Sequence, residues 1–532
     1  MRAGLQRVPV PQPARQQSRV ETIPSPSRGW IANENLSRVK PGAAFQLDNW
    51  VPTLTGARLR KGTQLFATTG TVPVTALFTY RSGVTKEIFA ADATKIFDIS
   101  SVADPAIAPA AAVSSQTGGD YSTFQFEVAG GDYLYCLNGL DSPQLYNGSA
   151  WAAVTGVSSI AITNVTTSLL IQGWVYRNRI YMVETLSMSA WYLPVDAVGG
   201  AATEISLRGV FQLGGKLLFG STWSLDAGDG IDDKCVFVSD QGEVAVYEGS
   251  YPGDSTWSLV GVYQITKPLG KNAHFKAGGD LLIMTNDGIV PISQALTKDK
   301  AALSLAAITR NIEPEWIKEI QARSTYGPWE MMKWPSHNIA IIALPGVSTE
   351  SPRYCFIVNL ETGSWARWTG LDVQVLALHD EHGYFGTQTG TVVKMETTGA
   401  DQGVAYTCVH VPHFMDMKAP ARDKTVHMAR ATFRASVPFT PQMSASVNYI
   451  VSLPAVPAAT ASNSTNVWDT AVWDTDLWDG AGVFTVTARW VSIGESGFVV
   501  APQVQVTCGD TVAPDAELIS IDVLYELGEV VV

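Results

Sequence analysis

The stretch CVFVSDQGEVAVYEG (235–249) shows the organising unit of this chain: an apolar run, a short polar turn and a second apolar run. Both runs are rich in valine, with phenylalanine in the first and tyrosine in the second, and these residues favour extended backbone. Gln241 and Gly242 lie between the runs, and glycine reaches at low cost the positive φ angles that tight turns require. The stretch therefore predicts a β-hairpin.

The same pattern recurs along the chain. It returns in EIFAADATKIFDIS (87–100), YLYCLNGLDSPQLYNGSAW (133–151), LLIMTNDGIVPIS (281–293), YCFIVNLETGSWARW (354–368) and GYFGTQTGTVVKME (383–396). Intervals of 47, 44, 57 and 46 residues separate the equivalent positions Phe89, Cys136, Ile180, Phe237 and Ile283. A four-stranded propeller blade takes about 40–50 residues, so this period favours an all-β, β-propeller-like array of about six blades. A string of β-sandwiches is the competing architecture.

Three other segments differ from the repeats. Residues 1–30 carry arginines at positions 2, 7, 15, 19 and 28 among five prolines, which predicts an extended basic arm, either free or docked on an acidic neighbour. Residues of about 294–323 have helical composition, with Pro314 at a predicted helix start, and form a helical insertion between blades. Residues 403–532 predict a C-terminal β-sandwich or barrel-like domain, which leaves 31–402 for the propeller-like domain.

Charged residues are scarce. The 532 residues include 36 Lys plus Arg and 49 Asp plus Glu, a net charge of −13, and only 16% of the chain is charged. Soluble domains usually carry about 25% charged residues. This composition argues against disorder, and its sign opposes the wrapping of nucleic acid. Because charge is depleted at the centres of interfaces, it also suits a surface that packs against copies of the same chain.

Targeting and redox signals are weak. Residues 1–28 lack the apolar run of a secretory signal, so none is expected. The longest uncharged stretch, 142–176, is broken by Ser, Thr, Asn and Gly, so it predicts strands and no membrane span. The five cysteines, Cys136, Cys235, Cys355, Cys408 and Cys508, are far apart, which predicts buried free thiols in a reducing cytoplasm.

Two acidic segments are candidate cation sites. SLDAGDGIDDKC places Asp226, Asp229, Asp232 and Asp233 in one glycine-rich loop, but the spacing does not match an EF-hand, so an acidic hairpin loop is favoured over a calcium site. WDTAVWDTDLWD favours an irregular loop anchored by Trp468, Trp473 and Trp478. The alternative there is a hard cation held by Asp469, Asp474, Asp476 and Asp479.

No catalytic signature is present. His379 and His382, like His410 and His413, are three residues apart, a spacing that turns side chains to opposite faces of a strand and forms no metal site. HExxH, GxSxG, the Walker A loop and GxGxxG are absent, and no carboxylate pair can be identified as a glycosidase site. We therefore assign no catalytic, cofactor-binding or metal-binding residue, expect no cofactor, and do not expect an enzyme.

Several stretches resemble virion proteins of tailed phages. They are GAAFQLDNWVPTLTGARLRKGT (42–63), NGLDSPQLYNGSAW (138–151), GGDLLIMTNDGIVPISQALTKDKAAL (278–303) and the stretch 177–217. With the closing DVLYELGEVV (522–531), the chain is similar to the tail nozzle family of short-tailed phages, also called tail tubular protein B.

The resemblance implies a structural protein of the virion tail, assembled in the host cytoplasm. It implies a homo-oligomer, a hexameric ring below the adaptor and portal that continues the DNA-ejection channel. The implied partners are copies of the chain, tail adaptor or head–tail connector proteins, tail fibre or spike proteins, and viral DNA that passes without specific binding. An acidic lumen would suit that role. The alternative is a receptor-binding or glycan-processing propeller tail protein.

Overall fold

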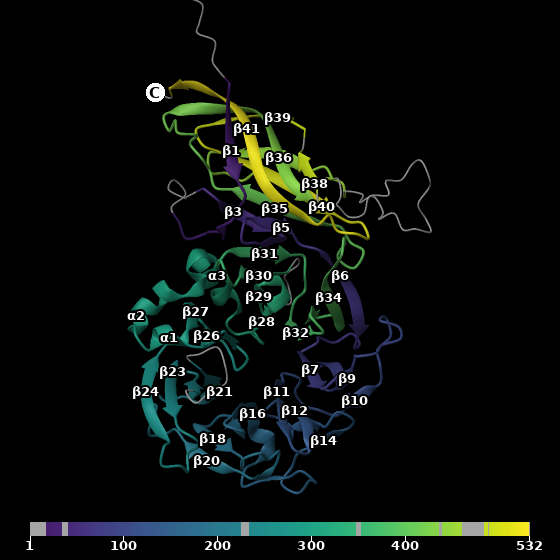
Figure 1. The fold of residues 1–532 in the computed structure, drawn as a ribbon, viewed down its shortest axis with the longest axis vertical. Coiled ribbons are helices and arrows are strands. Elements are labelled where there is room, and N and C mark those ends of the chain that lie inside the picture. Colours follow the sequence, from purple (N-terminus) through teal and green to yellow (C-terminus); the bar gives the residue numbers. More distant parts are fainter. Residues whose placement is uncertain are drawn as a thin grey trace, which may run out of the picture.

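A computed structural model describes residues 18–34, 41–224, 233–346, 353–435, 439–459, 484–487 and 489–530. The chain is an all-β protein, and Figure 1 shows a ring of small sheets with a β-sandwich on its rim. The helices among these residues gather in one segment. The propeller array and the additional β domain predicted from the sequence are confirmed.

Six antiparallel sheets, together with the part of a larger sheet that contains β28 to β31, form the blades of the ring. Four complete blades follow one another along the chain. They are β7 (Ala76–Ser82), β8 (Thr85–Ala91), β9 (Ile96–Asp98) and β10 (Ala111–Val113); β11 (Ser122–Val128), β12 (Gly131–Leu137), β13 (Gln144–Tyr146) and β14 (Trp151–Ala153); β16 (Leu170–Tyr176), β17 (Arg179–Glu184), β18 (Ser189–Tyr192) and β20 (Thr203–Ser206); and β21 (Leu217–Trp223), β22 (Lys234–Ser239), β23 (Glu243–Glu248) and β24 (Ser258–Gln264).

Helices replace the outer strand of the fifth blade, which has only β25 (His274–Ala277), β26 (Asp280–Thr285) and β27 (Gly288–Pro291). The predicted insertion follows it as α1 (Ile292–Ala295), α2 (Lys300–Leu303) and α3 (Glu313–Arg323), and Pro314 lies in the first turn of α3 as expected. Short 3-10 turns and one two-stranded pair complete the connections: η1 (Thr167–Leu169), η2 (Ser304–Ala306), η3 (Ile308–Ile312), η4 (Pro335–His337), and β15 (Ile162–Thr163) with β19 (Gly200–Ala201).

The last two blades connect the ring to itself and to the sandwich. The sixth contains β28 (Glu330–Trp334), β29 (Ile339–Ala343), β30 (Tyr354–Asn359) and β31 (Trp365–Thr369). The seventh contains β32 (Val375–His379), β33 (His382–Gly386), β34 (Thr391–Thr398) and, as its outer strand, β6 (Gly62–Thr68). Because β6 precedes the first blade in the chain, its pairing with β34 closes the ring. The ring therefore has seven blades, where the sequence predicted about six.

The β-sandwich is built from both ends of the described chain. One sheet contains β1 (Arg19–Pro24), β4 (Trp50–Pro52), β5 (Ala57–Leu59), β36 (Arg422–Ala435), β38 (Phe484–Thr487), β39 (Val491–Gly497) and β41 (Ala516–Val530). The facing strands are β2 (Gly29–Trp30), β3 (Ala43–Asp48), β35 (Tyr406–Pro412), β37 (Gln442–Val447) and β40 (Val500–Cys508). One core, with Leu47, Trp50, Phe433, Val504 and Ile521, lies between them.

The predicted domain boundaries need correction at the N-terminal side. Residues 29–59 supply β2 to β5 of the sandwich, whereas the prediction placed residues from 31 onward in the propeller. Residues 1–17 of the predicted arm lie outside the described residues. The described part is extended, but β1 pairs with β41 of the same chain from Arg19 onward. These pairings join residues about 500 positions apart, which hydrophobic periodicity within a short window does not detect.

The sandwich and the propeller share one sheet. Strands β28 to β31 of the sixth blade continue through β2, β3, β35, β40 and β37 as a single nine-stranded sheet. Beside it, the buried Arg60 donates two hydrogen bonds to Asp401, of 2.8 and 2.5 Å, and its guanidinium lies 3.8 Å from the ring centre of Tyr406. Continuous backbone pairing and a buried ion pair join the two domains rigidly.

Candidate functional site

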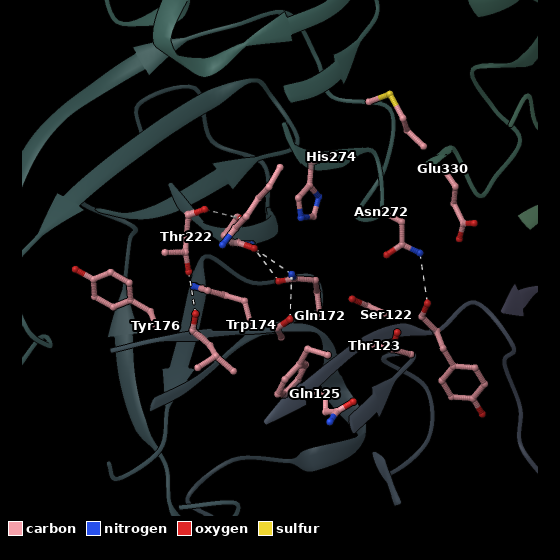
Figure 2. Close-up of a pocket in the computed structure, with 18 of the residues that line it drawn as sticks. Ser122, Thr123, Gln125, Gln172, Trp174, Tyr176, Thr222, Asn272, His274 and Glu330 are labelled. Atoms are coloured by element: carbon pink, nitrogen blue, oxygen red, sulfur yellow. Dashed lines mark hydrogen bonds between the residues drawn. The ribbon is translucent and has the colours of Figure 1, made fainter. Parts of the chain in front are cut away.

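A cavity of about 830 Å³ lies on the axis of the propeller. The innermost strand of every blade contributes to its wall, since it is lined by Leu77 on β7, Ser122 on β11, Gln172 on β16, Gly220 on β21, His274 on β25, Glu330 on β28 and Leu376 on β32. Polar side chains from strands far apart in the sequence therefore meet on one axis (Figure 2). This channel is the candidate functional site.

A polar bridge crosses one mouth of the channel. Asp120 directly precedes Tyr121 at the start of the second blade, and Lys271 and Asn272 precede the fifth. The Nζ of Lys271 donates to the carbonyl oxygen of Asp120 over 2.6 Å and lies 3.5 Å from its carboxylate. Asn272 donates longer bonds of 3.4 Å to the Asp120 carboxylate and the Tyr121 carbonyl. Two blades separate these segments on one side of the ring and three on the other, so the bridge spans the channel.

Glu330 lies in the channel beside this bridge. Its Oε2 accepts a hydrogen bond of 3.0 Å from the backbone N–H of Leu376. Burial raises the pKa of Glu330 to about 8, although the Leu376 N–H favours the carboxylate; the nearby Asp120 charge adds to the rise and Lys271 opposes it. The side chain is therefore mostly a neutral carboxylic acid at pH 7, able to donate one hydrogen bond and accept others.

His274 lies in the channel on the neighbouring blade. Its ring stacks on Phe219 with centres 4.1 Å apart and planes within 3° of parallel. Burial lowers the pKa of His274 to about 4, so the imidazole is neutral at pH 7. Its Nδ1 atom is buried and has no hydrogen-bond partner among the described residues. Figure 2 shows His274, Asn272 and Glu330 on one side of the cavity, with Ser122 and Thr123 across from them.

Other polar groups of the wall hold the blades together. The Gln172 side chain donates to the carbonyl of Gly220 and accepts from its N–H, both at 3.0 Å, as a paired strand would. Thr222 donates to the carbonyl of Val175 over 2.8 Å. A Cβ at Gly220 would lie only 2.1 Å from the Trp174 ring, so the close approach of β16 and β21 requires glycine there. These groups have a structural role.

The opposite mouth contains one residue of the predicted acidic loop. Asp233 lines the channel there with Tyr176, Arg177 and Asn178. The Tyr176 hydroxyl lies 2.6 Å from the carbonyl oxygen of Gly249 and 3.0 Å from that of Asp233. Asp226, Asp229 and Asp232 lie outside the described residues, as do the Trp-Asp dipeptides at 468–479.

The histidine pairs lie in different settings. His379 and His382 are direct partners across the β32–β33 hairpin, because Asp380 and Glu381 form its turn with φ angles of 46° and 64°. The prediction that these two turn to opposite faces is wrong, since it treated them as one strand and cross-strand partners share a face. His410 packs edge-on against Trp50, and His413 against Phe45.

Among the described residues, no group of three or more His, Cys, Asp or Glu side chains is arranged to bind a metal ion. All five cysteines are buried and unpaired, as predicted. None of the helices in the described part of the chain has the length and hydropathy that a membrane crossing requires.

Comparisons with known proteins add the following. No protein-family model and no curated protein sequence matches the chain. Similar solved structures include the Cps50 (Swd1) β-propeller domain of Myceliophteria thermophila, at 11% identity and a TM-score of 0.39, covering 63% of this chain and 100% of that one. BBS1N in complex with ARL6DN is 10% identical, with a TM-score of 0.39, and the match covers 67% of this chain and 99% of that one. YCF48 from Cyanidioschyzon merolae is 8% identical, with a TM-score of 0.35, and the match covers 63% of this chain and 98% of that one. The assignment of the fold here follows from the strand pairing described above.

Sequence reasoning did not identify the channel residues. They lie on the innermost strands of seven different blades, so no local motif brings together residues from different blades. The available signal is a polar residue near the start of an innermost strand, as Gln172 in LIQGWVY (170–176) and Glu330 in EMMKW (330–334). Chemically, the channel offers neutral hydrogen-bonding groups beside the Lys271–Asp120 bridge, and charged side chains at Arg177, Asp233 and Lys276.

Proposed function

We propose that this chain is a structural subunit of a phage tail that forms an oligomeric nozzle ring around the DNA-ejection path. The proposal starts from the resemblance of residues 42–63, 138–151, 177–217 and 278–303 to tailed-phage virion proteins. Its expected partners are further copies of the chain, tail adaptor or connector proteins, and fibre or spike proteins. Viral DNA would pass without specific binding.

The nine-stranded sheet is the observation that best supports a structural role. It connects the sixth blade with the sandwich through continuous strand pairing, from β31 through β2 and β3 to β35. The Arg367–Asp48 ion pair, at 2.8 Å, links β31 to β3 within that sheet. Domains joined by short linkers usually move relative to each other. A subunit that transmits force along a tail needs the opposite property, and a shared sheet supplies it.

The axis of a single propeller does not suit a DNA conduit, because the Lys271–Asp120 bridge crosses it. A lumen for DNA would therefore lie between several copies. The net charge of −13 supports a passage that does not retain DNA, since acidic walls repel phosphates.

Electron microscopy and mass photometry of the purified full-length chain test this proposal. The expected result is a closed ring with a central opening, whose lumen-facing residues are mainly acidic once the ring is resolved. A closed assembly with a lumen lined by Lys and Arg, or without an opening, would contradict it.

The second candidate is a receptor-binding or glycan-processing tail protein. One observation favours it: polar groups line the channel, and Glu330 is a part-buried carboxyl there whose pKa is raised. In this role the propeller acts as a recognition disc for a host glycan. A glycan array and a hydrolysis assay test this role, which predicts glycan binding or a hydrolysis product. If neither is detected and the chain forms rings, the nozzle is favoured.

A further inference from the structure

We propose that the propeller channel is a binding site for a small, neutral molecule with several hydroxyl groups, about one or two sugar rings in size. The ligand lies between Glu330 and His274 on one side of the channel and Ser122 and Thr123 on the other (Figure 2). This inference is independent of the nozzle proposal, and it gives the second candidate function a ligand class and a location in the channel.

The first argument is the position of Glu330. A buried carboxyl is unfavourable unless an opposite charge or hydrogen bonds satisfy it. The nearby cation, Lys271, is already bonded to Asp120, and the only hydrogen bond to the Glu330 carboxylate among the described residues comes from the Leu376 N–H, to Oε2. Its Oε1 therefore remains available. Acids whose pKa is strongly shifted by burial concentrate at binding and catalytic sites.

The second argument is the match between the hydrogen-bonding groups. The protonated Glu330 and the hydroxyls of Ser122 and Thr123 can each donate and accept hydrogen bonds. In the neutral His274 ring, one nitrogen donates a hydrogen bond and the other accepts one. Hydroxyl groups of a ligand have this same dual capacity. The charged side chains of the wall, Lys276, Asp233 and Arg177, belong to the later parts of their strands or to the loops that follow, toward the opposite mouth. A neutral ligand therefore fits the inner part better than a charged one.

The third argument is size and shape. Small-molecule sites usually have volumes of about 300–1,000 Å³, with apolar walls and a few converging polar groups. The channel, at about 830 Å³, has Leu77, Trp174, Met331 and Leu376 among its lining residues. These apolar surfaces can contact the C–H faces of a sugar ring. The Lys271–Asp120 bridge crosses the mouth beside Glu330, so the opposite mouth is the expected route of entry for the ligand.

The probes are glucose and maltose, with gluconate and glucosamine as charged analogues, measured by saturation-transfer NMR and titration calorimetry on the full-length protein. The expected result is binding of glucose or maltose, with each charged analogue at least about tenfold weaker. Replacement of Glu330 by leucine, with thermal unfolding checked, should weaken binding about tenfold, because the hydrogen bonds of the acid are lost. Absence of binding of both neutral sugars would overturn the proposal.

Two further variants separate a role in binding from a role in folding. Glu330→Gln keeps a neutral donor and acceptor, so it should bind at pH 7 within about threefold of the wild type. Glu87→Gln is the matched control, because Glu87 on β8 also has a raised pKa from burial but does not line the channel. Equal loss of binding in the glutamine variants of Glu330 and Glu87 would contradict a specific site.

The pH profile supplies an independent readout. The charged or titratable groups acting on Glu330 are Asp120 and Lys271, and His274 shares its cavity. Wild-type affinity should fall above about pH 8, where Glu330 loses its proton, and Glu330→Gln should remove that fall. An unchanged alkaline profile in the glutamine variant would show that Glu330 does not contact the ligand.

Discussion

Lys271 donates a hydrogen bond of 2.6 Å to the carbonyl oxygen of Asp120, from the start of the fifth blade to the start of the second. The two segments are 151 residues apart in the chain and meet across the channel, whereas the pairing of β34 with β6 closes the ring. Because the bond crosses one mouth of the channel, a conduit for DNA would lie between copies, and a ligand would enter the channel through the opposite mouth.

Removal of the bridge should loosen that mouth. In Lys271→Met the bonds to Asp120 are lost, so amide hydrogen exchange at residues 120–123 and 272–274 should become about tenfold faster. Hydrogen-exchange mass spectrometry measures this effect. Lys86→Met is the control, because Lys86 pairs with Asp380 at the exposed surface. Equal effects of the two variants would mean that the bridge contributes nothing to closure.

Replacement of Gly220 by alanine should destabilise the propeller by about 2 kcal/mol or more, because the added Cβ would lie 2.1 Å from the Trp174 ring. Urea unfolding measures the change. Gly209→Ala is a matched control, since a Cβ there meets no atom within 4 Å. That control should change stability by less than about 0.5 kcal/mol.

The Arg60–Asp401 pair should be essential to the domain junction. Arg60→Met leaves Asp401 largely buried without its counter-charge, so we expect a loss of about 3–5 kcal/mol. The double variant with Asp401→Asn should lose less than the sum of the two single changes, by about 1–3 kcal/mol. Arg81→Met, at an exposed position, is the control for the loss of an arginine. Strict additivity in the cycle would refute the coupling.

Buried histidines should make the protein sensitive to acid. Burial lowers the pKa of His410 to about 3 and of His413 to about 4, below the value of about 6.5 in the unfolded chain. The unfolded state therefore binds protons that the folded state does not, and stability should fall as the pH drops from about 6.5 toward 4. The slope is about 1 kcal/mol per pH unit for each such histidine.

The variant that tests this is His410→Phe, which keeps an aromatic ring beside Trp50 but cannot titrate. Its urea midpoint should fall less than that of the wild type between pH 7 and pH 5. His382→Phe, at an exposed turn, should follow the wild type more closely. Glu330 acts in the opposite direction because its pKa is raised, so each comparison is made with the wild type at the same pH.

Local features of the fold could be predicted and long-range ones could not. The hairpins of 235–249 and 281–293 follow from apolar runs and turn residues, and α3 follows from its composition and Pro314. The closure of the ring by β6, and the contribution of β2 to β5 to the sandwich, are pairings between distant segments. Because each participating strand is short, only the assembled structure reveals its partner.

The candidate site was missed for the same reason. His274 and Glu330 are 56 residues apart and become neighbours only through the ring. The cavity, the burial of its side chains and the raised pKa of Glu330 arise only when the blades fold into the ring. By contrast, the two acidic segments considered as cation sites from the sequence, the acidic loop and the Trp-Asp dipeptides, lie largely outside the described residues.

The most direct test of the central proposal is cryo-electron microscopy of the purified full-length chain, concentrated enough to drive self-association. The account predicts a closed ring of copies whose central opening lies between subunits, with an acidic lumen and with each propeller channel bridged by Lys271 and Asp120. A chain that remains monomeric at every concentration, or a ring whose lumen is lined by Lys and Arg, would contradict it.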